Sequence, residues 1–487
     1  MSSSAGGNLK SAVAKGFLWG GMSNVVCQLL NLFIGIFLAR ILGPDDYGPV
    51  GMLAIFSAIA GSLQDSGFVA ALANRKQVTH DDYNAVFWFN IIVSGVMYAV
   101  LFFSAPLIVD FFDEPSLLWL SRYIFLGFVV AGFGIAPSAY LFRELKVKER
   151  SIAQMLSIVV SGCVGIVLAV NGYSFWGIAT QSIMYVLVRS IVCWWFTPWR
   201  PSFRVNFAPL RYLFAFSYRL LITNIFLRIN WNIFSFILGG NRHYTRVDVG
   251  NYTKAAEWMG MGSEIVNGMV NNIAQPVLAK VAEDGERQLR VFRKMLRFTA
   301  FVSFPLLFGL SLVAPQIIVI AITDKWIESA YMLRVLALWG PFMPVQSMFT
   351  NLLISRGCSV VYMWGTVIQG IIVLLLLVAM APWGIQAMMF AYVLFNILWL
   401  FVWRHYAGVE IGLSIPMFLR DMFPYALLSA AIMMFTGYIT GSIENIYLLL
   451  LSRIAVAATL YIVILLLMRN DELSEVLDFL TRRKRKE

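Results

Sequence analysis

Charged and polar side chains recur three and four positions apart within one long, mostly apolar segment. This spacing places them on one face of an α-helix: Lys254, Glu257, Met261, Glu264, Gly268, Asn271 and Gln275. A cation on such a face can bind the phosphate or uronate groups of a substrate. A carboxylate in a poorly hydrated site can bind H+ or Na+, so Asp65, Glu257 and Glu264 are candidates for ion coupling. The two glutamates can equally neutralise Lys254 and Arg228, and both interpretations stay open.

Three other apolar segments carry polar faces of the same kind. Their members are Asn24, Gln28, Asn31 and Gly35; Gly61 and Asp65; and Asn224, Arg228, Trp231 and Ser235. Arg219 precedes the last of these faces and is expected nearer the membrane rim. We predict that these faces line one central substrate cavity, with Arg228, Lys254 and Arg219 as its cations. The alternative is that they pair across a dry helix interface.

The composition identifies the class of protein that must position these faces. Of 487 residues, 60% are hydrophobic and only 13% are charged, whereas soluble proteins carry about 25% charged residues. The chain is therefore expected to be an integral membrane protein. The same composition excludes a soluble multidomain enzyme and a disordered chain. The net charge of +11 does not indicate a nucleic-acid binder, because in a membrane protein basic loops first report topology.

The hydropathy pattern predicts an all-α polytopic membrane protein with about fourteen transmembrane helices. The eighth expected span covers residues 249–278 and the tenth covers 331–355. Lys and Arg concentrate in the loops of one side, so both termini are expected in the cytoplasm. The other side holds few basic residues: Arg40, Arg242, Arg246 and Lys325.

The two halves of the chain carry matching landmarks in the same order. Ile41-Leu42-Gly43 matches Ile237-Leu238-Gly239, Gly48 matches Gly250, Pro137 matches Pro344, and Trp176-Gly177-Ile178 matches Trp383-Gly384-Ile385. This repeat predicts an N-terminal six-helix lobe over 1–206 and a second over 207–411. An extra helix pair over 412–468 and a basic cytoplasmic tail over 469–487 follow. Two lobes of the same orientation suit a transporter with its site between them.

Catalytic motifs are missing from the sequence. No G-x-x-x-x-G-K-[ST] phosphate loop occurs, and His80, His243 and His405 are scattered over expected loops. We therefore predict a transporter without catalytic residues, metal ligands or cofactor-binding residues, whose only small co-substrate is a coupling H+ or Na+. The basic stretch 280–297 is expected to lie along anionic headgroups.

The segment Ala39-Arg40-Ile41-Leu42-Gly43-Pro44-Asp45-Asp46-Tyr47-Gly48 follows the polar first helix. By itself it indicates an architectural role, since Gly43-Pro44 ends a helix and Asp45-Asp46 favours a turn and a cap. It also resembles the polysaccharide-transport branch of the multidrug/oligosaccharidyl-lipid/polysaccharide exporter superfamily, and looks like the Wzx-type flippases of polysaccharides and O-antigen.

This resemblance implies a monomeric flippase of the bacterial inner membrane. Its substrate would be an undecaprenyl-pyrophosphate-linked oligosaccharide, moved from the cytoplasmic to the periplasmic leaflet by alternating access for capsule, O-antigen or exopolysaccharide synthesis. The implied partners are membrane lipids, a polysaccharide polymerase and a chain-length regulator, with no nucleic acid. The family places basic cavity residues on the first, second, seventh and eighth helices, which Arg228, Lys254 and Arg219 match. Asp65 and the two glutamates depart from a strongly cationic cavity, which argues against a strongly anionic glycan or else for cation coupling.

Three other functions are compatible with a polytopic chain. A multidrug or cation antiporter of the same superfamily would be expected to have twelve spans, whereas this chain is expected to have fourteen. A lipid II flippase is a near relative, but the loop around Gly43 favours the polysaccharide branch. A membrane polymerase or acyltransferase would need a catalytic constellation and a larger outer loop, and the sequence shows neither.

Overall fold

The computed structural model describes residues 23–65, 72, 75, 78–204, 206–475 and 478. Within these ranges the side chains of residues 65, 212–217, 219, 220 and 272 lie outside the description. Every regular element in the described residues is a helix, which confirms the predicted all-α class. The chain divides into two compact units, Met1–Gly250 and Asn251–Glu487.

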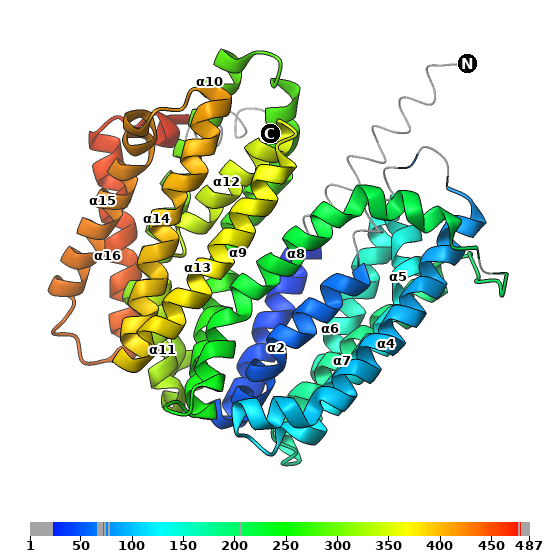
Figure 1. Cartoon of the computed structure of the whole chain (residues 1–487). Helices are drawn as coiled ribbons and strands as arrows, with labels where there is room; N and C mark the ends of the chain where they lie inside the picture. Colours follow the sequence, from blue (N-terminus) through cyan, green and yellow to red (C-terminus); the bar gives the residue numbers. More distant parts are fainter. Residues whose placement is uncertain are drawn as a thin grey trace, which may run out of the picture. The chain divides into compact units, whose positions relative to one another are not determined.

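The first unit is a bundle of long apolar helices (Figure 1). Within it α6 packs on α7, α4 and α7 pack on α5, and α2 packs on α8. The bounds are Ser23–Ile41 for the first described helix, then α2 Pro44–Asp65, α4 His80–Phe112, α5 Leu117–Arg143, α6 Val147–Val170, α7 Phe175–Phe196 and α8 Ala208–Gly240.

Aromatic rings join four of these helices. The Phe56 ring on α2 lies 6.4 Å from the ring of Phe112 on α4, 6.4 Å from that of Phe125 on α5 and 6.0 Å from that of Phe236 on α8. The contacts are edge-to-face, the arrangement that the ring quadrupoles favour. This cluster fixes α8 against the rest of the first unit, and so fixes the face of α8 that carries the candidate site residues.

The second unit begins inside a helix, because the boundary falls after the first residues of α9. Its elements are α9 Arg246–Lys280, α10 Gly285–Ile322, η1 Asp324–Trp326, α11 Ile327–Leu336, α12 Phe342–Ser355, α13 Ser359–Met380, η2 Ala381–Trp383, α14 Ile385–Ile411, α15 Ile415–Ile439 and α16 Ile446–Leu467. The helix α10 packs against α11, α15 and α16. Trp326, Trp403 and Phe349 are fully buried in this unit.

Twelve helices in the described residues are long and apolar enough to cross a membrane, so the predicted count of fourteen is not confirmed. Two expected spans account for the difference. The eighth forms one long helix, α9, but the charged and polar stripe makes it too polar to be among the twelve candidate spans. The tenth is broken between α11 and α12 at residues 337–341, where Gly340 and Pro341 adjoin. Proline has no N–H to donate and disfavours helical backbone in the residue before it.

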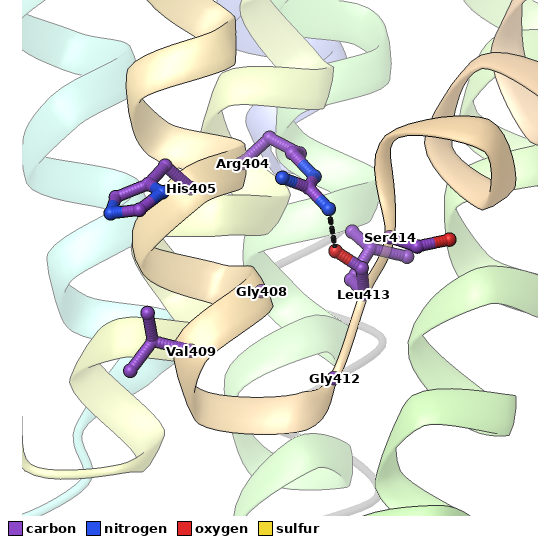
Figure 2. Close-up of a pocket in the computed structure, with 7 residues that line it drawn as sticks. All are labelled: Arg404, His405, Gly408, Val409, Gly412, Leu413 and Ser414. Atoms are coloured by element: carbon purple, nitrogen blue, oxygen red, sulfur yellow. Dashed lines mark hydrogen bonds between the residues drawn. The ribbon is translucent and has the colours of Figure 1, made fainter.

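A three-residue turn, 412–414, joins α14 to α15 (Figure 2). Gly412 ends α14 with a φ of +71°, in the left-handed region that glycine adopts without strain. Ser414 begins α15, and its Oγ accepts a hydrogen bond from the Met417 N–H at 3.3 Å. Because α14 extends to Ile411, His405 lies in this helix and not in the expected loop.

The helix α10 holds the extra pair α15 and α16 along its length. Near one end the Tyr461 hydroxyl of α16 donates to the Phe301 carbonyl at 2.8 Å. Further along, Arg453 donates from Nη1 to Gln316 Oε1 at 2.8 Å and to the Leu312 carbonyl at 3.0 Å. These bonds fix α16 on α10, and α15 packs against the same helix.

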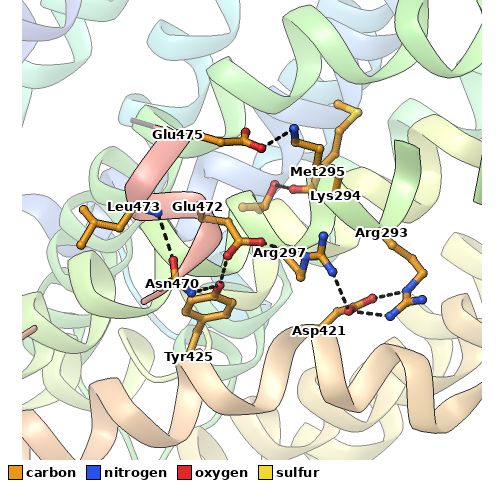
Figure 3. Close-up of polar contacts among 11 residues, drawn as sticks. Arg293, Lys294, Met295, Arg297, Asp421, Tyr425, Asn470, Glu472, Leu473 and Glu475 are labelled. Atoms are coloured by element: carbon orange, nitrogen blue, oxygen red, sulfur yellow. Dashed lines mark hydrogen bonds and ion pairs between the residues drawn. The ribbon is translucent and has the colours of Figure 1, made fainter. Parts of the chain in front are cut away.

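A charged cluster closes the end of α10 that carries the basic stretch (Figure 3). Arg293 holds Asp421 of α15 in two bonds, from Nε at 2.6 Å and from Nη2 at 2.9 Å. Arg297 lies 3.8 Å from Asp421 and 2.8 Å from Glu472. At these two arginines the basic stretch forms ion pairs within the protein, and the expected headgroup contact of residues 280–297 stays a prediction.

Glu472 belongs to the segment that follows α16. Burial raises the pKa of its carboxyl, but the hydrogen bond from Tyr425 and the charge of Arg297 outweigh burial, so the pKa lies below its ordinary value. A carboxyl with a lower pKa in the folded state stabilises the fold at neutral pH. That stabilisation is lost as the pH falls through the lowered value.

Candidate substrate and ion site

One end of the polar stripe on α9 is a buried ion pair. Lys254 Nζ lies 2.7 Å from Glu257 Oε2, and the Lys254 side chain is only 2% exposed against 37% for Glu257. The ammonium also lies 5.9 Å from the centre of the Trp326 ring, within reach of a cation–π contact. Lys254 is thus neutralised by Glu257 and covered by Trp326, and only the glutamate is open to a ligand.

The rest of the stripe is more open. Glu264, Asn271 and Gln275 are exposed, and a Cβ added at Gly268 would meet no atom within 4 Å. Asn271 Oδ1 accepts a hydrogen bond from Asn351 Nδ2 at 2.9 Å, which fixes the amide against α12. Among the described residues Glu264 forms no ion pair.

Ser347 and Asn267 make a second bridge between α12 and α9. The Ser347 hydroxyl donates to Asn267 Oδ1 at 2.9 Å. Because both bridges join α9 to α12, they hold the open part of the stripe in one orientation. Glu264 therefore combines an accessible carboxylate with a fixed backbone, as an ion site requires.

The first unit presents its own polar side chains. Arg228 is exposed on α8 and lies within the candidate membrane span Leu221–Gly240. Asn224 and Trp231 on the same helix are exposed as well, and so are Asn24, Gln28 and Asn31 on the first described helix. A guanidinium at membrane depth is expelled from lipid and must face water or a polar ligand.

Two candidate side chains, those of Asp65 and Arg219, lie outside the described residues. Of the other candidates, the structure brings Lys254 and Glu257 together. The single cavity expected to unite the polar faces of both units stays a prediction.

The first unit also contains two short segments with the same hydrogen-bonded geometry. Asp46 Oδ2 accepts from the Gly43 N–H at 2.9 Å, and Asp248 Oδ2 accepts from the Thr245 N–H at 2.8 Å. Both aspartates lie in the first turn of a helix, α2 and α9, where their charge is favourable. The landmarks of the internal repeat therefore correspond to a repeated local structure.

These two segments approach each other reciprocally. A Cβ added at Gly48 would lie 2.0 Å from the Arg246 carbonyl oxygen, and one added at Gly250 would lie 1.9 Å from that of Pro44. The two contacts are equivalent in the repeat, because Pro44 is separated from Arg246 by as many positions as Gly48 is from Gly250. Such approach requires glycine on each helix, because real Cβ contacts are never so short.

An ion pair spans the same contact. Arg246 donates from Nε to Asp45 Oδ1 at 2.5 Å and from Nη2 to Asp45 Oδ2 at 2.7 Å, and its Nη1 lies 3.8 Å from Glu114. The hydrogen bond to Asp45 raises the pKa of the Arg246 guanidinium above its ordinary value. Asp45 thus contacts another segment of the same chain, in agreement with the architectural role expected for the segment 39–48 from its residue types.

The repeat was the signal that could have predicted this contact. Sequence analysis matched Gly48 with Gly250 but did not pair either with the other's helix. Trp326, Asn351 and Ser347 were also missed, because they lie outside the regular polar spacing.

Comparison with known proteins now identifies the family. A family described as "Polysaccharide biosynthesis protein" matches residues 37–331, more than half of the chain. The chain belongs to this family. It is a membrane transport protein of polysaccharide biosynthesis and not an enzyme, and its helices make it a multi-pass membrane protein.

Two curated relatives are similar over most of their length. The chain is 23% identical to the teichuronic acid biosynthesis protein TuaB of Bacillus subtilis (strain 168), over 92% of this chain and 93% of TuaB. It is 23% identical to the lipopolysaccharide biosynthesis protein WzxC of Escherichia coli (strain K12), over 72% of this chain and 71% of WzxC.

A solved structure has a similar fold. The lipid II flippase MurJ in an inward closed conformation matches with a TM-score of 0.72, at 13% identity, over 93% of this chain and 99% of that one. At this identity the likeness shows the fold alone, and places this family member in the same structural class.

Proposed function

We propose that the chain flips a lipid-linked oligosaccharide, carried on undecaprenyl pyrophosphate, from the cytoplasmic to the periplasmic leaflet of a bacterial inner membrane. It works as a monomer by alternating access, with both termini in the cytoplasm, and delivers its substrate to a polysaccharide polymerase and chain-length regulator. The observation that carries the proposal is the exposed Arg228 within a candidate span of a polysaccharide-transport family member.

The chemistry of arginine supports this substrate class. A guanidinium presents planar pairs of N–H donors that match the oxygens of a phosphate group. The exposed amides Asn224, Asn24 and Gln28, and the indole of Trp231, offer the hydrogen bonds and apolar surface that a sugar requires. Lys254 is neutralised by Glu257, so it attracts an anionic substrate less strongly than Arg228 does.

Deletion of the gene tests the substrate class. The expected result is accumulation of a complete lipid-linked oligosaccharide in the cytoplasmic leaflet, with loss of the surface polysaccharide. Normal surface glycan together with new sensitivity to cationic dyes would instead indicate an antiporter and overturn the proposal.

Replacing Arg228 by alanine is expected to lower glycan export about tenfold or more. The physical reason is the loss of charge-assisted hydrogen bonds worth about 1.5–3 kcal/mol. Export is measured as surface polysaccharide per amount of membrane-inserted protein. Arg242→Ala is the matched control, because Arg242 is 80% exposed and its ion pair with Asp113, at 4.0 Å, is long. If the two variants exported glycan equally well, Arg228 would not be a substrate-binding residue.

Glu264 is proposed to couple transport to an H+ or Na+ gradient. A glutamine there keeps the shape of the side chain but binds neither ion as a carboxylate does. Glu264→Gln is therefore expected to abolish the dependence of transport on pH or Na+ in proteoliposomes, while Glu283→Gln, at an exposed loop position, leaves it unchanged. An unchanged ion dependence in Glu264→Gln would assign the carboxylate a structural role.

A further inference from the structure

A hollow of about 230 Å³ lies beside the turn that joins α14 to α15. Figure 2 shows His405 and Val409 on one side of Gly408, with Arg404 and Ser414 on the other. Because Gly408 has no side chain, the turn can pass close to α14 beside the hollow. A Cβ there would lie 2.9 Å from the Leu413 carbonyl oxygen and 3.5 Å from Arg404 Cζ.

The polar groups of the hollow are mainly hydrogen-bond donors. Arg404 uses Nη2 to bind the Leu413 carbonyl, and its buried Nε has no partner among the described residues. A guanidinium has five N–H donors, so several remain for a ligand. The Ser414 hydroxyl accepts from Met417 and can still donate its own proton.

The electrostatics of the hollow favour an anion. Arg404 and His405 contribute to its lining, and no acidic residue does. The nearest acid along the chain, Glu410, instead accepts from the Cys358 thiol at 3.3 Å. Ser414 also begins the 25-residue helix α15, whose first N–H groups carry partial positive charge.

Exposed apolar side chains occur in and next to the hollow. Val409 lines it and is 72% exposed, while Ile415 and Tyr406, which follow the lining residues Ser414 and His405 in the chain, are 48% and 39% exposed. Tyrosine is enriched at the depth where lipid headgroups meet the hydrocarbon. The polar pocket can hold the charged headgroup of a lipid, and the apolar side chains beside it can contact the acyl chains. A free anion would use the polar pocket alone.

We propose that this hollow binds the phosphate of an anionic phospholipid, with Arg404 and Ser414 as donors and with Val409 and Ile415 against the acyl chains. Arg404 and Arg420 flank the turn, and basic segments are expected on the cytoplasmic side, so we assign the lipid to that leaflet. Its binding ties the second unit's α14–α15 turn to the membrane surface. The site is independent of the proposed substrate cavity and of the residues assigned to it.

The test uses the full-length protein, purified in detergent and stripped of lipid. It is titrated with dioleoyl phosphatidylglycerol or dioleoyl phosphatidylcholine, and bound lipid is counted by native mass spectrometry. Val409→Glu adds a negative charge at an exposed lining position, and Val409→Gln is its neutral match. Arg404→Gln removes a donor, and Arg420→Gln removes an equal charge from an exposed position outside the hollow.

The expected result is that phosphatidylglycerol binds about tenfold more weakly to Val409→Glu and Arg404→Gln than to wild type. Val409→Gln and Arg420→Gln should bind it as wild type does. Val409→Glu keeps the test decisive if Arg404→Gln disturbs the turn. Equal binding by Val409→Glu and Val409→Gln would overturn the proposal. So would equal affinity for both lipids, or full displacement of the lipid by millimolar inorganic phosphate.

Discussion

Replacing Arg293 by alanine is expected to destabilise the protein by about 3 kcal/mol. Removing one partner of a buried ion pair costs about 3–5 kcal/mol, because the remaining charge stays in a poorly hydrated site. Asp421 is 1% exposed and receives two bonds from Arg293 at 2.6 and 2.9 Å. Arg297, at 3.8 Å, supplies one weaker contact, so the lower end of the range applies.

The neighbouring residue on α10 provides a matched control. Lys294 lies 2.7 Å from Glu475, but both side chains are 60% exposed, and exposed ion pairs contribute only about 0–1 kcal/mol. Lys294→Ala should therefore leave the unfolding midpoint in denaturant close to that of wild type. If both alanine variants unfolded at the same denaturant concentration, the cluster would not be a source of stability.

Replacing Gly48 or Gly250 by alanine is expected to destabilise the protein by about 1–3 kcal/mol each, the usual cost of overpacking. The new methyl group would meet a carbonyl oxygen at 2.0 or 1.9 Å, and backbone cannot rotate aside as a side chain can. The measurement is thermal unfolding of the purified protein in detergent, followed by size-exclusion chromatography. Both variants should also weaken the Asp45–Arg246 ion pair beside them.

The same two helices contain glycines that give the opposite result. A Cβ at Gly61 in α2 or at Gly268 in α9 would meet no atom within 4 Å. Alanine is favoured over glycine in a helix by about 1 kcal/mol, so Gly61→Ala and Gly268→Ala should raise the melting temperature. A similar fall for all four variants would mean that helix flexibility, and not the close approach, decides the outcome.

Much of the fold followed from local patterns. Apolar runs predicted the long helices, and three- and four-residue spacing predicted the polar face of α9 with Glu264, Asn271 and Gln275. The tenth expected span is divided where Gly340 precedes Pro341, a pair that weakens the helix without lowering the hydropathy of the segment much. A lone proline does not have this effect here, since Pro305 and Pro315 lie inside α10. Hydropathy therefore detected the segment but not its division.

Contacts between distant segments were not predictable in the same way. Periodicity gives the face of a helix and not the partner of that face, so Lys254 could have met either a substrate or a neighbouring glutamate; the structure pairs it with Glu257 and places it near the Trp326 ring. Arg293 and Asp421 are 128 positions apart and share no local pattern. The mutual approach of Gly48 and Gly250 was within reach, because the repeat had already matched them.

The separation of Arg293 from Asp421 also has a consequence for biosynthesis. Ribosomes add about 5–20 residues each second, so the 128 positions between these residues take roughly 6 to 26 seconds to translate. During that interval α10 has left the ribosome while its arginine lacks a counter-charge. We expect this end of α10 to stay in contact with water or lipid headgroups until α15 arrives. A nascent chain that stalls before Asp421 would carry an unneutralised cation, a feature that membrane proteases can use to remove it.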